Sequence, residues 1–579
     1  MLSYWNDFSI SSLSLLFDAN YPLTGKNSLP IVSSVKGNIL SKISKSNTIT
    51  KGDGSMKQPP ISKEMQCHEL TEYWSEEFPD KVYLYYEDEE ISFKTLNQRV
   101  NSAAWHFRSL GIQKGDRVGI FMVNSPDFLY AWFGLNKIGA VMVPVNTGFR
   151  QNETKFILND AGCRGVICDE KFLENVVMPS VRQSLSVEWV AVRESSTATE
   201  VLSFKDFTAH NTSVETVHWP NEDLAAILYT SGTTGKPKGV MCPFRYYSTI
   251  GHTSASYLKL TPDDRLLTIL PLFHMNAQTT SAMGALFFGA SLIMLTGFNP
   301  ATFWQLISRY KATIFNYLGL MFPFLEMMAV TPEEQNNPVR FAAGAQADPK
   351  KIPEYEKRWG LSIIELYGMT EIGGTCNPLG AKKIGSCGVP LPGHELRIIG
   401  DKDQVLPPGE IGQIIARGPS MTLGYWNNPE ETAAIYRNGW VHTGDVGYLD
   451  SEGYLFFVGR TKDIIRRSGE NIAAVEIENT VMEHPKIAEA AAVPVPDPIR
   501  DEEVKIYVVL KPGETSETVP PQEIVDWCAQ RLAKFKIPRY IEYINSLPKT
   551  TTFKVKKIVL INEKPDLTVG AWDRFAGKT

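Results

Sequence analysis

Apolar runs and polar connections alternate along residues 116–168 in the order that parallel α/β proteins show. Residues 116–123 are almost continuously apolar, which predicts a buried strand. Ser125 and Pro126 then supply an N-cap and a first-turn proline for a helix over residues 128–138. The remaining predicted elements are a strand at 140–145, a helix at 152–160 and a strand at 165–168. This β-α-β-α-β order predicts a parallel sheet covered by helices on both faces.

The same pattern returns in residues 265–315. Strands are predicted at 265–270 and 290–295, with a helix at 277–288 between them. Asn299 and Pro300 are expected to cap a further helix that reaches Tyr310, and another strand begins at Thr313. The most apolar window, residues 281–298, is interrupted by Gly284, Gly289 and Ser291, so we interpret it as a buried helix and strand rather than a membrane span.

The lengths of the predicted strands and helices change near residue 463. Shorter elements follow, such as a strand at 504–510 and a helix at 523–533. We therefore predict a large N-terminal α/β domain over residues 61–460 and a small, mobile α+β domain over 461–579, with a hinge near 462. Residues 1–60 are Ser- and Lys-rich and are predicted to be a disordered extension, with a targeting peptide as the alternative.

Composition narrows the function classes. With 43% hydrophobic and 21% charged residues, the 579-residue chain has the balance of an ordinary globular protein. The net charge of −6 gives no reason to expect a nucleic-acid partner. The seven cysteines are dispersed and no two have CxxC spacing, which favours free thiols in a reducing, cytoplasmic compartment over disulfides or a zinc site.

The strongest chemical signal is a Gly/Ser/Thr/Lys-rich loop that follows an apolar run at residues 224–228. Its glycines expose backbone N–H groups, its hydroxyls add donors, and its lysines add positive charge, so it can wrap a polyphosphate. It is not a Walker loop, because Thr230 stands where that pattern requires glycine. A polar surface hairpin is the alternative. The candidate phosphate-binding residues are Thr230, Ser231, Gly232, Thr233, Thr234, Gly235, Lys236 and Lys238.

With this loop the sequence resembles the adenylate-forming superfamily of acyl-CoA synthetases, adenylation domains and firefly luciferase. The resemblance runs from about residue 65 to 560, and within the family it is greatest to the crotonobetaine/carnitine–CoA ligase and medium-chain acyl-CoA synthetase branches. It implies an acid–thiol ligase that uses ATP and Mg²⁺ to form an acyl-AMP from a small carboxylic acid. Coenzyme A is then the expected acyl acceptor.

The resemblance assigns roles within a second motif, Tyr367-Gly368-Met369-Thr370-Glu371. It implies that Thr370 touches the phosphates and that Glu371 holds Mg²⁺, an ion that prefers hard oxygen ligands. Taken alone, Thr-Glu after a glycine is more often the start of a helix.

Further positions are expected to bind the nucleoside. By resemblance, Gly344 and Ala345 line the adenine, on which Tyr367 stacks, although Ala343 stands where the family usually has glycine. Asp445 is expected to accept the ribose hydroxyls, with Arg460 as its partner on the same ribose. A neutral turn at 343–346 and an exposed turn aspartate are the alternatives.

The mobile domain and the acyl pocket carry the remaining assignments. By resemblance, Lys462 is the hinge, Ser468 and Gly469 approach the thiol tunnel, and Lys554 is the adenylation lysine. Phe553 stands where the family commonly has glycine, so a surface lysine in a basic tail is the alternative. His274 is expected to gate the acyl pocket and the tunnel, the alternative being a core histidine.

Three other functions remain open at this point. They are a stand-alone adenylation enzyme that loads a carrier-protein thiol, a luciferase-like oxidation, and a nucleotide-binding protein without catalysis. Amino-acid substrates are disfavoured, because His274 stands where amino-acid-activating members usually have an aspartate. The sequence leaves the acid and the oligomeric state open.

Overall fold

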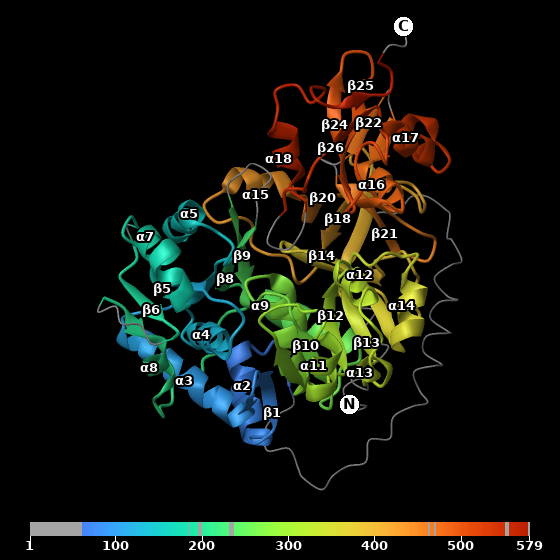
Figure 1. Cartoon of the computed structure of the whole chain (residues 1–579). Helices are drawn as coiled ribbons and strands as arrows, with labels where there is room; N and C mark the ends of the chain where they lie inside the picture. Colours follow the sequence, from blue (N-terminus) through green and yellow to red (C-terminus); the bar gives the residue numbers. More distant parts are fainter. Residues whose placement is uncertain are drawn as a thin grey trace, which may run out of the picture. The chain divides into compact units, whose positions relative to one another are not determined.

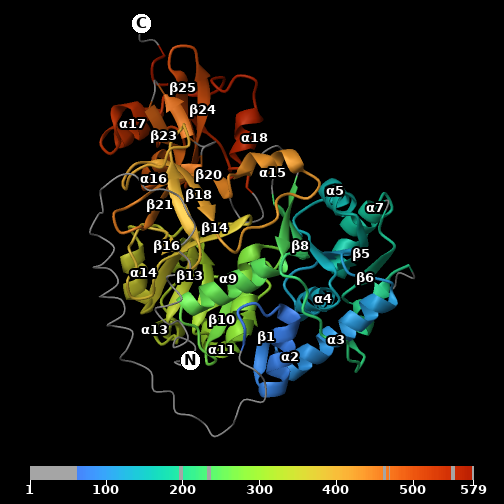
Figure 2. The ribbon, with the colours of Figure 1, turned by 180° about the vertical axis from the view of Figure 1, so that it is seen from behind.

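The computed structural model describes residues 61–184, 186–194, 200–230, 237–460, 464–467, 470–549 and 555–576 (Figures 1 and 2). The predicted N-terminal extension lies outside these residues. In the described ranges, the helices lack the combined length and apolarity that a membrane span requires. The seven cysteines all fall within the described ranges and are free thiols.

The first sheet grows from the predicted β-α-β-α-β segment. Its neighbouring strands are parallel except for the final pair, β8–β9. In spatial order, the described strands are β7 (Leu202–Ser203), β6 (Trp189–Val192), β5 (Cys163–Cys168), β3 (Arg117–Phe121), β4 (Val141–Pro144), β8 (Leu224–Thr230) and β9 (Lys238–Pro243). The helical segments of this region are α2 (Cys67–Glu77), α3 (Phe93–Ser109), α4 (Pro126–Lys137), α5 (Gln151–Ala161), α6 (Glu170–Phe172), η3 (Leu173–Val177), α7 (Met178–Val181) and α8 (Phe204–Thr208).

Alternate residues of this sheet pack into two different cores. On β4, Met142 joins the core that contains α3 and α4, whereas Val141 and Val143 join the core that contains α5. Because successive side chains of a strand point to opposite faces, helices must cover both faces of the sheet. Figure 1 shows α5 and α7 on one side of the teal strands and α3 and α4 on the other. The predicted doubly covered parallel sheet is confirmed.

The second sheet contains the later α/β block. Six of its described strands are mutually parallel: β1, β10, β11, β12, β13 and β14. Antiparallel strands extend the sheet at both edges, β2 at one and β15 and β16 at the other. In spatial order, the described strands are β16 (Val389–Pro390), β15 (Ile372–Cys376), β14 (Ser362–Met369), β13 (Phe341–Ala345), β12 (Ile314–Leu318), β10 (Arg265–Thr268), β11 (Ser291–Met294), β1 (Val82–Tyr86) and β2 (Glu89–Ser92). Its helical segments are α9 (Phe244–Tyr257), η4 (Ala277–Met283), α10 (Gly284–Phe288), α11 (Phe303–Tyr310), α12 (Met321–Glu326), α13 (Pro332–Gln335) and α14 (Ile352–Trp359).

Two predicted helices of this block differ in detail. The helix expected at 277–288 is a π-helical stretch, η4, that continues into α10. The cap predicted at Asn299 is wrong, because α11 begins at Phe303 with Thr302 as its N-cap. The Asn299 side chain instead accepts a hydrogen bond from the Ala301 backbone N–H at 3.0 Å, which closes a local turn.

A third sheet was not predicted from the sequence. It is antiparallel and follows the second sheet in the chain. Its described strands are β17 (Glu395–Ile399), β18 (Gly412–Arg417), β19 (Tyr436–Arg437), β20 (Trp440–Leu449) and β21 (Leu455–Arg460), with helix α15 (Pro429–Ile435) beside it. Two of the predicted site residues lie on this sheet.

The C-terminal part has a sheet of its own, as predicted for an α+β domain. Val493 and Tyr507 pack with α18 residues on one face, while Ala492 and Ile506 pack with α16 and α17 on the other. The described strands are β22 (Ile464–Arg467), β23 (Glu470–Ala473), β24 (Ile487–Asp497), β25 (Asp501–Leu510), β26 (Tyr540–Tyr543) and β27 (Trp572–Asp573), and the helices are α16 (Ala474–Met482), α17 (Pro521–Ala529), η6 (Lys534–Lys536) and α18 (Lys557–Asn562). The domain limits at 460 and 461 stay a prediction.

Candidate functional site

The predicted phosphate loop joins two antiparallel strands. Thr230 ends β8 and Lys238 begins β9, and the two residues are paired across the hairpin. The Lys238 ammonium lies 2.7 Å from a carboxylate oxygen of Glu431 and 5.5 Å from the centre of the Tyr425 ring. The loop residues Ser231, Gly232, Thr233, Thr234, Gly235 and Lys236 lie outside the described residues.

Thr370 and Glu371 form the turn of a second hairpin rather than the start of a helix. Met369 of β14 pairs with Ile372 of β15, which leaves these two residues at the tip. Glu371 is nevertheless buried, with 6% of its surface exposed. The Tyr425 hydroxyl donates a hydrogen bond of 2.6 Å to Glu371 Oε1. Burial raises the pKa of the Glu371 carboxyl, and this hydrogen bond offsets part of the increase.

The Glu371 carboxylate can supply the oxygen ligand that a magnesium ion takes from a protein. Mg²⁺ takes most of its oxygen ligands from water and nucleotide phosphates, so one or two carboxylates suffice. The Tyr425 hydroxyl bonds one of the two carboxylate oxygens, Oε1. When bound, Mg²⁺ would neutralise charge on the phosphate oxygens. The magnesium role of Glu371 stays a prediction.

The predicted nucleoside-binding residues Tyr367, Asp445 and Arg460 lie together. Asp445 on β20 is directly opposite Arg460 on β21, and Arg460 Nε lies 2.9 Å from Asp445 Oδ1. The Tyr367 hydroxyl donates a hydrogen bond of 2.8 Å to Asp445 Oδ2. Burial, together with the nearby Asp445 carboxylate, raises the pKa of Tyr367 well above its usual range. The residues predicted to contact the base and the ribose, Tyr367 and Asp445, are thus in direct contact.

The segment predicted to line adenine ends strand β13. Gly344 pairs with Tyr317 on one side and Glu365 on the other. A Cβ atom at Gly344 would lie 2.1 Å from the Tyr317 carbonyl oxygen, so no larger residue fits without moving the strand. The next residue after Ala345, Gln346, has a left-handed φ of 70°. Its backbone N–H donates to Glu365 Oε2 at 3.1 Å, which holds the turn.

His274 lies in the loop after β10 and is half-buried. Its ring centre is 4.7 Å from that of Phe273. The buried Gln278 amide fastens this loop: it donates to the Leu272 carbonyl at 2.6 Å and accepts from the Tyr247 hydroxyl at 2.8 Å. The loop carrying His274 is therefore held by a buried side chain that is hydrogen-bonded at both its nitrogen and its oxygen.

The remaining predicted site residues are one catalytic lysine and three cofactor-binding residues. Lys462, Ser468, Gly469 and Lys554 lie outside the described residues. Their roles remain those that the sequence predicts.

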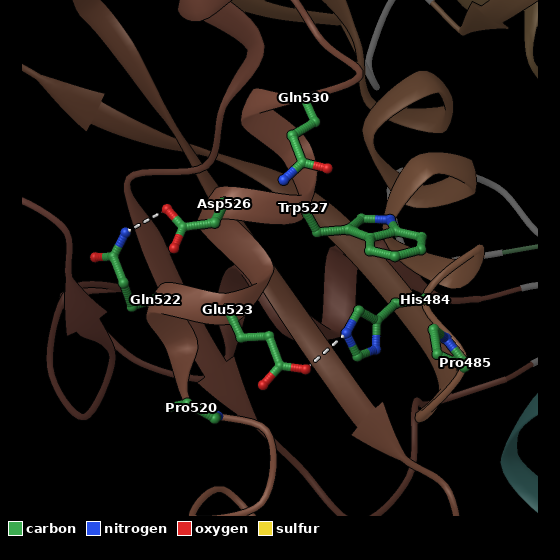
Figure 3. A pocket seen from close by; sticks show the side chains of 8 residues that line it. All are labelled: His484, Pro485, Pro520, Gln522, Glu523, Asp526, Trp527 and Gln530. Carbon is green, nitrogen blue, oxygen red and sulfur yellow. Dashed lines mark hydrogen bonds and ion pairs between the residues drawn. The ribbon is translucent and has the colours of Figure 1, made fainter.

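A groove of about 540 Å³ lies in the C-terminal part (Figure 3). His484 Nε2 lies 3.0 Å from Glu523 Oε1 at its wall, and the Gln522 amide donates to Asp526 at 2.8 Å. The groove contains none of the predicted site residues. We therefore do not assign it to the nucleotide site.

Comparison with known proteins identifies the family. Residues 71–426 match the model of the AMP-binding enzyme family, and residues 476–554 match that of the AMP-binding enzyme C-terminal domain. The chain belongs to the AMP-binding enzymes. This AMP-binding enzyme is 35% identical over 484 residues to the crotonobetaine/carnitine–CoA ligase of Proteus mirabilis, an alignment that covers 81% of this chain and 92% of the relative. It is 33% identical to the ligase of the same name from Citrobacter koseri, covering 84% and 98%.

Solved structures agree with this assignment. An anthranilate CoA ligase in complex with anthranoyl-AMP matches with a TM-score of 0.79 and 28% identity, covering 87% of this AMP-binding enzyme and 98% of that chain. ATP-bound MatB from Rhodopseudomonas palustris matches with a TM-score of 0.77 and 29% identity, covering 86% and 98%. The predicted membership of the adenylate-forming superfamily is confirmed.

Some residues at the site of this AMP-binding enzyme were not found from the sequence. Tyr425 bonds Glu371, Glu431 pairs with Lys238, and Glu365 holds the turn after Ala345. Tyr425 and Glu431 lie in a stretch rich in Gly, Asn and Pro, which signals turns but no chemistry.

Proposed function

We propose that the chain is an ATP-dependent ligase that joins a small carboxylic acid to coenzyme A through an acyl-AMP, with Mg²⁺ at Glu371. The broader class, an AMP-forming acid–thiol ligase, is confirmed by the family match and by the curated relatives. One observation carries the residue roles. A single hairpin, β14–β15, bears both Tyr367, which contacts Asp445, and the buried Glu371.

In the first half-reaction an oxygen of the substrate carboxylate attacks the α-phosphorus of ATP. A new P–O bond forms, the bond to the β-phosphate bridging oxygen breaks, and pyrophosphate leaves. Negative charge on the phosphoryl oxygens calls for preorganised donors and cations. The loop from Thr230 to Lys238, Thr370 and Lys554 would supply them, while Tyr367, Asp445 and Arg460 hold the nucleoside.

In the second half-reaction the sulfur of coenzyme A attacks the acyl carbonyl carbon. A thioester bond forms, the bond to the phosphate oxygen breaks, the thiol proton passes to solvent, and AMP leaves. We propose that the C-terminal domain turns about Lys462 between the two steps. This rotation would withdraw Lys554 and bring Ser468 and Gly469 to the thiol, with His274 gating the passage.

The acid is proposed to be small and uncharged apart from its carboxylate. Met275, Asn276 and Gln278, which follow His274 in the chain, are proposed to line the acyl pocket, and their side chains are apolar or neutral. Asn276 accepts a hydrogen bond from Asn316 at 3.2 Å, and Asn316 in turn accepts one from Ser281 at 2.8 Å. A neutral amide network offers no counter-charge to a cationic acid.

A coupled assay tests the proposal. The protein would be incubated with ATP, Mg²⁺ and a panel of short, medium, branched, aryl and betaine-like acids, with and without coenzyme A. We expect acid-dependent pyrophosphate release in both cases, and AMP plus thioester only with coenzyme A. Release of pyrophosphate with transfer only to a carrier-protein thiol would identify the alternative acceptor. If no acid supported pyrophosphate release, the ligase proposal would be wrong. Cytoplasmic localisation stays a prediction that fractionation can test.

A further inference from the structure

A segment far along the chain extends the strand that follows the phosphate loop. The Leu423 N–H donates to the Met241 carbonyl at 2.9 Å, and the Met241 N–H donates to the Gly424 carbonyl at 2.9 Å. The Trp426 N–H donates to the Gly239 carbonyl at 2.7 Å. Residues 423–426 thus lie antiparallel against β9.

The residues just before this segment hold the hairpin that bears Glu371. The Thr422 N–H donates to the Glu371 carbonyl at 3.0 Å, and the Thr422 hydroxyl donates to the same oxygen at 3.2 Å. The Gly373 N–H donates to Ser420 Oγ at 2.8 Å. Residues 420–426 therefore connect the phosphate-loop strand to the Glu371 hairpin, and we call them the bridging segment.

Tyr425 is the residue of the bridging segment that reaches the Glu371 carboxylate. It is 8% exposed, and its hydroxyl donates to Glu371 Oε1 at 2.6 Å. Its backbone is fixed by a bridge to Val240 and by the N–H bond to Thr432 Oγ1 at 2.9 Å. The Lys238 ammonium lies over its ring at 5.5 Å. Tyr425 thus contacts a phosphate-loop cation through its face and the carboxylate through its hydroxyl.

We propose that Tyr425 is a positioning residue for the magnesium site: it holds the Glu371 carboxylate in one orientation for the metal ion that would bind with ATP. This inference rests on the proposed function of Glu371. A carboxylate at the tip of a hairpin can rotate, and a metal ligand that rotates binds with a larger loss of entropy. A partner that bonds the other oxygen fixes the ligand, as outer partners do at metal sites in general.

The test measures ATP binding by calorimetry without acid or coenzyme A, in EDTA and over a series of Mg²⁺ concentrations. The wild type is expected to bind ATP more tightly as Mg²⁺ rises. In Tyr425→Phe this gain should fall about 10-fold or more, the size typical of a lost hydrogen bond to a charged group. Affinity for ATP in EDTA should stay as in the wild type, because Tyr425 acts through the metal ligand alone.

Two further variants separate positioning from general support. Tyr436→Phe is the matched control. It removes a hydroxyl that is hydrogen-bonded to Thr422 of the bridging segment and not to the Glu371 carboxylate. It should keep the wild-type response to Mg²⁺. In a Glu371→Gln background, adding Tyr425→Phe should have no further effect on that response, since the pair acts as a unit.

Several results would overturn the inference. They are a wild-type Mg²⁺ response in Tyr425→Phe, an equal loss in Tyr436→Phe, or a full additional loss in the Glu371→Gln background. These outcomes leave the proposed function standing, provided that the wild type binds ATP in a Mg²⁺-dependent way and Glu371→Gln does not. If Glu371→Gln responds to Mg²⁺ as the wild type does, the role proposed for Glu371 is wrong, and the inference falls with it.

Discussion

Replacing Asp445 by alanine should weaken ATP binding selectively. The carboxylate is 4% exposed, bonds the Tyr367 hydroxyl at 2.8 Å and pairs with Arg460 at 2.9 Å. If it also accepts the ribose hydroxyls, Asp445→Ala removes hydrogen bonds to a charged group, each typically worth about 1.5–3 kcal/mol. A loss of that size raises the KM for ATP roughly 10-fold to 150-fold, since each 1.36 kcal/mol is a factor of ten.

The same substitution should also lower the free energy of unfolding. The loss should be smaller than the loss on breaking a fully buried ion pair. Arg460 has 52% of its side chain exposed, so its guanidinium returns to water when the aspartate is lost. The partly buried Tyr367 hydroxyl instead loses its acceptor Asp445, which costs about 1–3 kcal/mol. At one fixed ATP concentration the ligand should stabilise the variant less than the wild type, because the stabilisation rises with the logarithm of the ratio of ATP concentration to Kd.

The assay follows pyrophosphate release at varied ATP and fixed acid, with thermal unfolding measured in parallel. Asp264→Ala is the matched control. Asp264 is 3% exposed and pairs with Arg340 at 2.7 Å, but it precedes β10 at the amino end of the strand, away from the carboxyl edge where nucleotide sites form. It should lose stability while keeping the wild-type KM for ATP. If Asp445→Ala shows the same KM as the control, Asp445 is a structural residue and the ribose assignment is wrong.

Three further predictions concern the metal and the two half-reactions. Glu371→Gln should keep the fold but need more Mg²⁺ for pyrophosphate release, because it removes charge with little change of volume; unchanged rates at limiting Mg²⁺ would contradict this. Lys462→Pro should spare acyl-AMP formation and abolish thioester formation, because proline fixes φ at the hinge; equal losses in both steps would indicate general damage. Lys554→Ala should slow adenylation by about 10²–10³, yet make thioester from preformed acyl-AMP and coenzyme A at nearly the wild-type rate; intact overall activity would make it a tail lysine.

The order of the parallel strands and their helices could be predicted from the sequence, because those elements are local. Residues 116–168 carry apolar runs of strand length and apolar spacings of helix length, so β3, α4, β4, α5 and β5 appeared where expected. The motifs and their order likewise identified the family. Glycines, hydroxyls and lysines in one short loop indicate phosphate binding, and this can be recognised without knowing the fold. The antiparallel sheet from β17 to β21 was not predicted, because the pairing of its strands joins segments that lie apart in the chain, such as β18 and β20.

Only the tertiary structure decided which side chains meet. Asp445 and Arg460 are opposite one another because of the register of β20 and β21, and that register shifts at an irregularity between Val446 and Gly447. A shift of one residue would turn the side chains to opposite faces of the sheet, so no pattern in the sequence fixes the contact. Tyr425 lies 54 positions from Glu371 and reaches it only because the bridging segment pairs with β9. The sequence determined which groups are present and what chemistry they favour, whereas long-range strand pairing determined which of them act together.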